Sequence, residues 1–151
     1  MDDFRQREIV LHRDLPFPRE LVWKALTDPE HVNRWWGPDG FTNENVVMDF
    51  RVGGLWTFTM VAPDGTRFPN EVRFKEITPP SRMIQDHGDG QRVWFESTID
   101  LEATPGGTRV TIRHLFPNQA ERDVVVEKYG AIEGGQQHLA KLEAYVREHL
   151  A

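Results

Sequence analysis

Residues 118–151 read NQAERDVVVEKYGAIEGGQQHLAKLEAYVREHLA and contain the longest helical pattern of the chain. Between Ile132 and Leu150, apolar or small residues recur at steps of three and four, whereas Lys, Glu, Gln and His occupy most other positions. This spacing predicts an amphipathic α-helix with one buried face. The stripe consists of Ile132, Gly135, Leu139, Leu142, Val146 and Leu150.

Three glycines, Gly130, Gly134 and Gly135, interrupt this helical pattern. Each costs about 1 kcal/mol relative to alanine in a helix interior, so the fold must offset the loss. Either a neighbouring segment approaches too closely for a β-carbon, or the missing side chains leave an empty volume beside the helix. These two interpretations predict different functions for the helix, close packing in one case and a pocket in the other.

The same stretch has a clear start signal and is too long to remain straight. Asn118 is a favoured N-cap and Glu121 has the spacing of a capping box. An unbroken helix over residues 119–150 would be about 45–50 Å long, whereas a domain of this size has a radius of gyration of about 15 Å. We therefore expect a kink or break near Gly130, with a short helical turn before it and the long packed helix after it.

The length and composition of the chain exclude several classes of protein. Because 151 residues is the size of one ordinary domain, residues 1–151 are expected to form a single one. The absence of cysteine excludes disulfides, thiolate metal sites and a cysteine nucleophile. A net charge of −6, with Lys and Arg scattered along the chain, argues against nucleic acid as a partner.

The amino terminus, MDDFRQREIV, opens with two acidic residues and has no long apolar run. It therefore lacks the pattern of a signal peptide and that of a membrane span. Since the lack of cysteine gives no sign of an oxidising compartment, we expect a cytoplasmic protein that does not insert into membranes.

The chain before the last helix predicts one strand, two short helices and about six antiparallel strands. Residues 7–15 are rich in apolar residues and end at Pro16, which indicates a first strand. Helical spacing over residues 18–27 and 30–36 indicates two short helices in a V-shaped hairpin. From residue 41 the apolar period is two, with turns at Gly53–Gly54, 63–65, Pro79–Pro80, 88–90 and 105–107. This order predicts an α+β domain in which the last helix covers a curved sheet.

Several motifs along the chain resemble those of a known family. LVWKALTDPEH at residues 21–31 leads into WWGP at 35–38, and DFRVGGLW, EITPPSR and GTRVT follow at 49–56, 76–82 and 107–111. With the C-terminal segment 133–145, they resemble the family related to the activator of the heat-shock protein 90 ATPase, in the START and birch-pollen-allergen-like superfamily. The resemblance covers most of the chain and implies a helix-grip fold, in which a sheet curls around the C-terminal helix and encloses a cavity.

The function that this resemblance implies is less specific than the fold. The superfamily includes lipid carriers, hormone receptors, polyketide aromatase/cyclases, hydrolases and a chaperone activator. The eukaryotic chaperone activators resemble this sequence only in their C-terminal domain, and 151 residues leave no room for their separate N-terminal domain. A chaperone-interacting stress protein is therefore the least favoured of three hypotheses.

Motifs for covalent, metal and nucleotide chemistry are absent from the sequence. Neither Ser81 nor Ser97 lies in G-x-S-x-G, which argues against a serine hydrolase. The six histidines lack the spacing of a metal site such as H-E-x-x-H, and no glycine-rich phosphate loop follows a strand. We therefore expect neither a metal nor a cofactor.

The favoured hypothesis is a binding site for a small apolar or aromatic molecule between the sheet and the last helix. Large aromatic side chains are more often core residues, and lining a cavity is the alternative. The residues expected to contact the ligand are Trp36, Trp56, Phe58, Phe74, Phe95, His114, Tyr129, Gly135 and Gln136. Whether the chain forms a homodimer is left open by these patterns.

An enzyme of the aromatase/cyclase or hydrolase type is the second hypothesis. His114 has the inward parity of Val110 and Ile112, so its imidazole should face the helix as a ligand contact or general base, or as a structural core histidine. Tyr129 could add a hydroxyl group, which makes His114 and Tyr129 the catalytic candidates.

Two polar pairs have a predicted orientation. Glu71 and Arg73 should point outwards as a surface pair, although a β-bulge that shifts the parity of the strand would bury them in the cavity. Asp86 and His87 are neighbours in a strand and should face opposite ways, so they are not expected to form a catalytic dyad.

Overall fold

The computed structural model describes residues 4–151. The prediction that no signal peptide is present rests partly on residues 1–3, which lie outside this range. The elements, in chain order, are η1 (Phe4–Arg7), β1 (Glu8–Leu15), α1 (Arg19–Thr27), α2 (Pro29–Trp35), β2 (Thr42–Met48), β3 (Leu55–Val61), β4 (Arg67–Thr78), β5 (Arg82–Gly88), β6 (Val93–Thr104), β7 (Gly107–Leu115), α3 (Gln119–Tyr129) and α4 (Ala131–His149). The predicted order of strand, two helices, six strands and C-terminal helices is confirmed.

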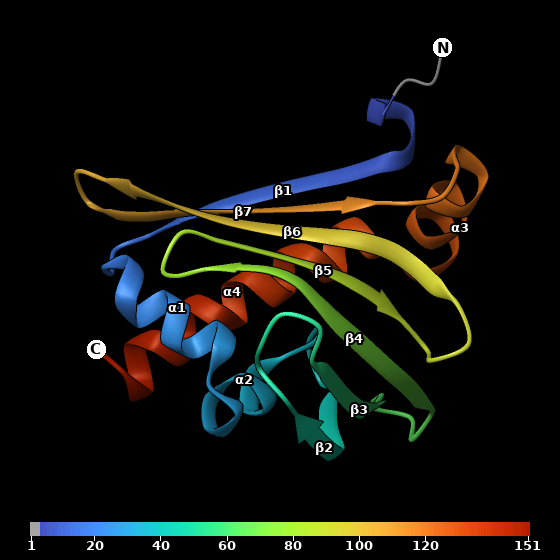
Figure 1. The fold of residues 1–151 in the computed structure, drawn as a ribbon, viewed down its shortest axis with the longest axis horizontal. Helices are drawn as coiled ribbons and strands as arrows, with labels where there is room; N and C mark the ends of the chain where they lie inside the picture. The colour runs from blue at the N-terminus through green and yellow to red at the C-terminus, as the bar shows by residue number, and fades with distance from the viewer. Residues whose placement is uncertain (1–3) are drawn as a thin grey trace.

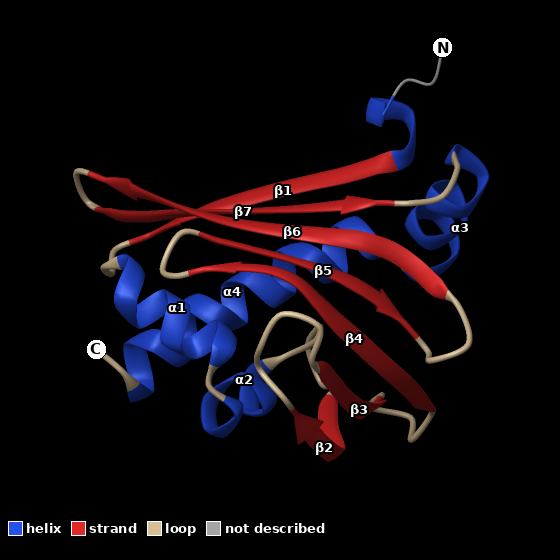
Figure 2. Cartoon of the chain, viewed as in Figure 1, coloured by secondary structure: helices blue, strands red, loops and turns tan. Residues whose placement is uncertain are grey.

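The seven strands form a single antiparallel sheet in the order β1-β7-β6-β5-β4-β3-β2. Figure 1 shows this sheet curving past α4, which runs along one of its faces. In Figure 2, α1 and α2 lie beside one part of α4, and α3 lies at the other end of the molecule near η1. The arrangement is the α+β helix-grip fold.

The buried face of α4 follows the stripe read from the sequence. Leu139, Leu142 and Val146 are fully buried, because they pack between the sheet and α1. Tyr145 joins them, and its hydroxyl is 2.7 Å from Nδ1 of His31 in α2. Burial of such side chains contributes about 1.5–3 kcal/mol each, so this contact fixes α4 against the sheet.

Gly130 separates α3 from α4, which confirms the predicted break. Its φ of 61° and ψ of 43° lie in the left-handed region, which glycine adopts at low cost. Asn118 is the N-cap of α3, and its Oδ1 accepts a hydrogen bond from the backbone nitrogen of Glu121 at 2.9 Å. The α3 helix has 11 residues, which is longer than the short turn expected, and the Glu121 carboxylate pairs with Arg92.

The first hairpin differs from the sequence prediction. β2 ends at Met48, so residues 49–54 form a connection longer than the Gly53–Gly54 turn expected. The backbone nitrogen of Asp49 donates to the carbonyl oxygen of Leu55 at 2.8 Å, and a β-carbon at position 54 would lie 2.1 Å from the Asp49 carbonyl oxygen. Phe50 lies in this connection, where its ring packs on Phe74 with centroids 4.9 Å apart.

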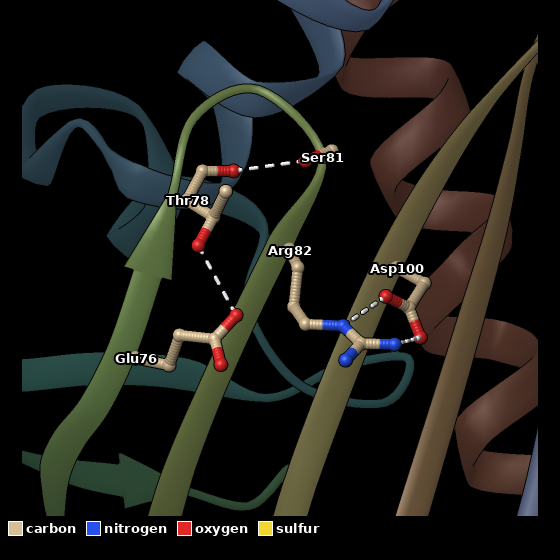
Figure 3. Close-up of polar contacts among 5 residues, drawn as sticks. All are labelled: Glu76, Thr78, Ser81, Arg82 and Asp100. Atoms are coloured by element: carbon tan, nitrogen blue, oxygen red, sulfur yellow. Dashed lines mark hydrogen bonds and ion pairs between the residues drawn. The ribbon is translucent and has the colours of Figure 1, made fainter.

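The turn between β4 and β5 contains Pro79–Pro80, as expected, and is held by side chains on the face opposite α4 (Figure 3). Ser81 Oγ donates to the carbonyl oxygen of Thr78 at 3.2 Å, and Thr78 Oγ1 donates to the Glu76 carboxylate at 3.1 Å. Arg82 donates to both carboxylate oxygens of Asp100 in β6, at 2.7 and 3.4 Å. Solvent weakens exposed pairs of this kind, so they support the turn without determining the fold.

Candidate functional site

A cavity of about 290 Å³ lies between the sheet and the first half of α4. Its sheet wall consists of side chains from β1, β6 and β7, together with His87 of β5 and Met60 of β3. The helical wall is the segment from Gly130 to His138, and α3 contributes Val125 and Tyr129. Residues 36–38, between α2 and β2, complete the lining.

The glycines of α4 satisfy both interpretations offered by the sequence, because the close approach occurs at the cavity wall. A β-carbon at Gly135 would lie 2.3 Å from Cδ1 of Leu11 in β1, far inside van der Waals contact. A β-carbon at Gly134 would lie 3.5 Å from Cγ of Pro38, which is an ordinary contact. Both glycines border the cavity. The missing side chain of Gly135 therefore lets β1 approach α4 closely and also leaves the cavity open beside the helix.

Five of the nine predicted ligand contacts border the cavity, and four do not. The five are Trp36, Phe95, His114, Tyr129 and Gly135. The prediction was wrong for the other four, which do not border the cavity: Trp56, Phe58, Phe74 and Gln136.

The four errors have three physical causes. Trp36 packs edge-on against Trp56 at 4.8 Å, and Trp56 stacks on Phe58 at 4.3 Å, so the Trp36 indole stands between them and the space. Phe74 is buried beneath Phe50. Gln136 is exposed. Successive residues of an α-helix are rotated by about 100°, so the residue after Gly135 points away from the cavity and towards solvent.

A β-bulge in β6 adds a second indole to the wall. His87 pairs with Phe95 and Gly88 pairs with Val93, so Trp94 is an extra residue in the ladder. Trp94 and Phe95 therefore both border the cavity, although neighbours in a regular strand face opposite ways. The period-two pattern of the sequence gave no sign of this bulge.

His87 borders the cavity as a neutral imidazole in a defined tautomer. Asn70 Nδ2 donates to the carbonyl oxygen of Phe68 at 2.8 Å, which leaves its Oδ1 as the acceptor for Nε2 of His87 at 2.6 Å. Nε2 therefore carries the proton and Nδ1 carries a lone pair. Burial lowers the pKa of His87 to about 4, so this form prevails at neutral pH.

His114 of β7 and His138 of α4 border the cavity from the sheet and from the helix, respectively. The His114 ring stacks on Phe95 with centroids 4.1 Å apart, and burial, together with His87 and His138, lowers its pKa to about 3. Nδ1 of His138 accepts a hydrogen bond from the backbone nitrogen of Gly37 at 3.1 Å. Burial and the charge of Lys141 lower the pKa of His138 to about 3. Both imidazoles are therefore neutral at pH 7.

Sequence reasoning missed His138 and Ser97 as cavity residues, and it considered His87 at the cavity mouth only as part of a possible pair with Asp86. His138 follows Gly135 by three positions, so helical periodicity could have placed it on the same face. Ser97 and His87 have the inward parity of buried neighbours in β6 and β5, so the strand period could have identified both.

The polar pairs on the other face of the sheet have their predicted orientation. Arg73 is exposed and donates to the carbonyl oxygen of Gly53 at 3.1 Å, and Glu71 shares its parity. A bulge does occur in β4, between Phe74 and Glu76, but it follows these residues and leaves their parity unchanged. Asp86 pairs with Lys75 on that face, whereas His87 points inward.

The cavity lining is almost entirely uncharged. Among the residues that the structure describes, those bordering the cavity include no Asp, Glu, Lys or Arg. Within residues 4–151, no three His, Cys, Asp or Glu side chains are grouped in a way that could hold a metal ion. None of the helices in that range has the length and apolarity needed to cross a bilayer.

The family profile described as "Activator of Hsp90 ATPase homolog 1-like protein" matches residues 16–147. The chain belongs to this family. The match spans both short helices, β2 to β7, α3 and most of α4. Membership of the Activator of Hsp90 ATPase homolog 1-like family confirms the resemblance noted from the motifs, and does not by itself identify a ligand.

Several solved structures share the fold of this chain. A protein from Nitrosomonas europaea is 29% identical, with a TM-score of 0.86, over 95% of this chain and 96% of that one. A protein from Arthrobacter aurescens is 25% identical, with a TM-score of 0.85, over 99% and 91%. An AHSA1-like protein from Aeromonas hydrophila shares the fold at 24% identity, with a TM-score of 0.74, over 93% and 92%. Comparison with curated proteins gives no significant match.

Proposed function

We propose that the protein binds a small apolar or aromatic molecule in the cavity between the sheet and α4. The observation that carries this proposal is a partly open cavity of about 290 Å³ with walls of mainly aromatic and aliphatic side chains. An apolar cavity of about 150 Å³ can hold one benzene molecule, so this space suits a molecule of about two fused rings. Ligand sites are typically concave and apolar, with a few polar groups that set orientation.

The chemistry of the polar groups favours binding over catalysis. A general base is most effective when its pKa lies near the working pH, whereas burial lowers the pKa of His114 to about 3. Tyr129, the other catalytic candidate, is 63% exposed at the edge of the cavity. A weak base and a solvated phenol make a poor catalytic pair, but neutral imidazoles are good hydrogen-bonding partners for a ligand.

Titration with naphthalene tests the proposal, because Trp36 and Trp94 border the cavity and their fluorescence should report occupancy. Val125→Trp should fill part of the cavity from α3 and abolish binding. Val124→Trp is the matched control, since Val124 is the preceding residue of the same helix, is 50% exposed and does not border the cavity. Equal binding by both variants, or no binding by the wild-type protein, would contradict the proposal.

A further inference from the structure

Three polar side chains form a row across the inner face of the sheet. Gln85 of β5 is directly opposite Ser97 of β6, and Ser97 is directly opposite His114 of β7. Opposed residues in antiparallel strands have β-carbons about 4.5–5.5 Å apart, so the three side chains are neighbours. Ser97 and His114 border the cavity. The row therefore brings hydrogen-bonding groups together on the sheet wall of the cavity, which also contains His87.

The side chains of this row make no hydrogen bonds with other residues in the range 4–151. Gln85 is 1% exposed, yet neither its Nε2 nor its Oε1 has a hydrogen-bond partner among the described residues. The imidazole of His114 stacks on Phe95, and no hydrogen bond from residues 4–151 reaches either ring nitrogen. The great majority of buried polar groups in proteins are paired. Gln85 does not itself border the cavity, but its unpaired amide lies next to Ser97, which does.

The nearby groups constrain the charge and the hydrogen-bonding type of a partner for this row. His87 presents a lone pair on Nδ1, because its Nε2 donates to Asn70. Ser97 and neutral His114 can each donate and accept. An anion or cation would enter without a countercharge, since no charged side chain among the described residues borders the cavity. The suitable partner is thus an uncharged group that both donates and accepts.

We propose that the ligand is an uncharged aromatic molecule of about two fused rings that carries a hydroxyl group, and that this hydroxyl binds at the Gln85–Ser97–His114 row. The inference rests on the proposed function and specifies its ligand class. A hydroxyl donates one hydrogen bond and accepts others, whereas a ketone or ether oxygen would leave the His87 lone pair without a donor. The rings would lie against Trp36, Trp94 and Phe95, which border the same space.

Three probes of similar size separate this inference from the proposed function: 2-naphthol, naphthalene and 2-naphthoate. We expect 2-naphthol to bind with a Kd about tenfold lower than that of naphthalene, because it adds hydrogen bonds to the row. Binding of 2-naphthoate, which is anionic at pH 7, should be undetectable. Calorimetry at pH 7 with the full chain measures all three.

Variants of the row test the position of the hydroxyl. Ser97→Ala and His114→Phe should bring the ratio of the naphthalene and 2-naphthol Kd values towards one. The matched control is Thr98→Val, because Thr98 is the next residue of β6, has the opposite parity and does not border the cavity. Its Kd ratio should match that of the wild-type protein. A ratio that the row variants leave unchanged would overturn the assignment of the hydroxyl site.

The remaining outcomes are distinguishable. Equal Kd values for 2-naphthol and naphthalene would overturn the inference and leave the proposed function standing. Binding of 2-naphthoate as tight as that of 2-naphthol would overturn the requirement for an uncharged ligand. If none of the three probes bound, the proposed function and the inference would both be wrong.

Discussion

Replacing Gly135 by alanine tests how closely β1 approaches α4. The new β-carbon would lie 2.3 Å from Leu11 Cδ1, about 1.1 Å inside the 3.4 Å at which ordinary contacts begin. Cδ1 is the end of a flexible side chain that itself borders the cavity. We therefore expect Leu11 to rotate into the cavity, at some cost in packing, rather than the backbone to shift.

The size of the effect follows from two opposing contributions. Alanine is favoured over glycine in a helix by up to about 1 kcal/mol. Overpacking in a filled region costs about 1–3 kcal/mol, so Gly135→Ala should leave the free energy of unfolding unchanged or lower it by up to about 2 kcal/mol. Gly134→Ala is the matched control, because its β-carbon would lie 3.5 Å from Pro38 Cγ and meet no clash. That variant should gain about 0.5–1 kcal/mol.

Urea denaturation followed by tryptophan fluorescence measures both variants. Gly135→Ala should also weaken naphthalene binding, since Leu11 would occupy part of the cavity. In a double-mutant cycle with Leu11→Ala, the clash should disappear and give a coupling energy of about 1 kcal/mol. Equal stabilisation by Gly134→Ala and Gly135→Ala, without coupling to Leu11, would refute the close approach of β1 to α4.

Three further predictions concern stability. Asn118→Ala should lower the free energy of unfolding by about 1 kcal/mol through loss of the α3 cap, and an unchanged urea midpoint would contradict this. Gln85→Met should raise it by about 1–2 kcal/mol without ligand, because an unpaired buried amide is removed; a lower thermal midpoint would argue for a hidden partner. Burial lowers the pKa of His87 to about 4 and those of His114 and His138 to about 3, from about 6.5 in the unfolded chain. The unfolded state then binds more protons below about pH 6.5, so stability should fall on acidification towards pH 4, by up to about 1.4 kcal/mol per pH unit for each histidine. Urea midpoints that stay constant between pH 7 and pH 5 would contradict this.

Local signals in the sequence accounted for most of the fold. The change from period two to period 3.6 gave the order of strands and helices, because each period follows from backbone geometry alone. Asn118 and Gly130 marked the start of α3 and the break before α4, since capping and a left-handed φ of 61° depend on residues close in the chain. The prediction of a tight turn between β2 and β3 was wrong. Hydrogen bonds and contacts of residues 49–54 end the strand at Met48, although the apolar alternation of the sequence continues to Phe50.

The candidate site could be predicted only in part. His114 and Gly135 were placed correctly, because strand parity and helical spacing decide which face a side chain takes. Parity does not decide which side chains from other segments of the chain cover that face. Trp56 and Phe58 point inward as expected, yet the indole of Trp36, from a different segment, lies between them and the space.

The sequence alone predicted the order of the elements, the buried stripe of α4 and the break at Gly130, and its resemblance to a known family implied the helix-grip fold. Tertiary structure decided where the resulting space lies and which groups face it. The bulge at Trp94 depends on the register between β5 and β6, and the contact of Gly135 with Leu11 joins segments more than a hundred residues apart. The physical reason is that periodicity records local geometry, whereas a cavity is the volume left between elements that no single segment encodes.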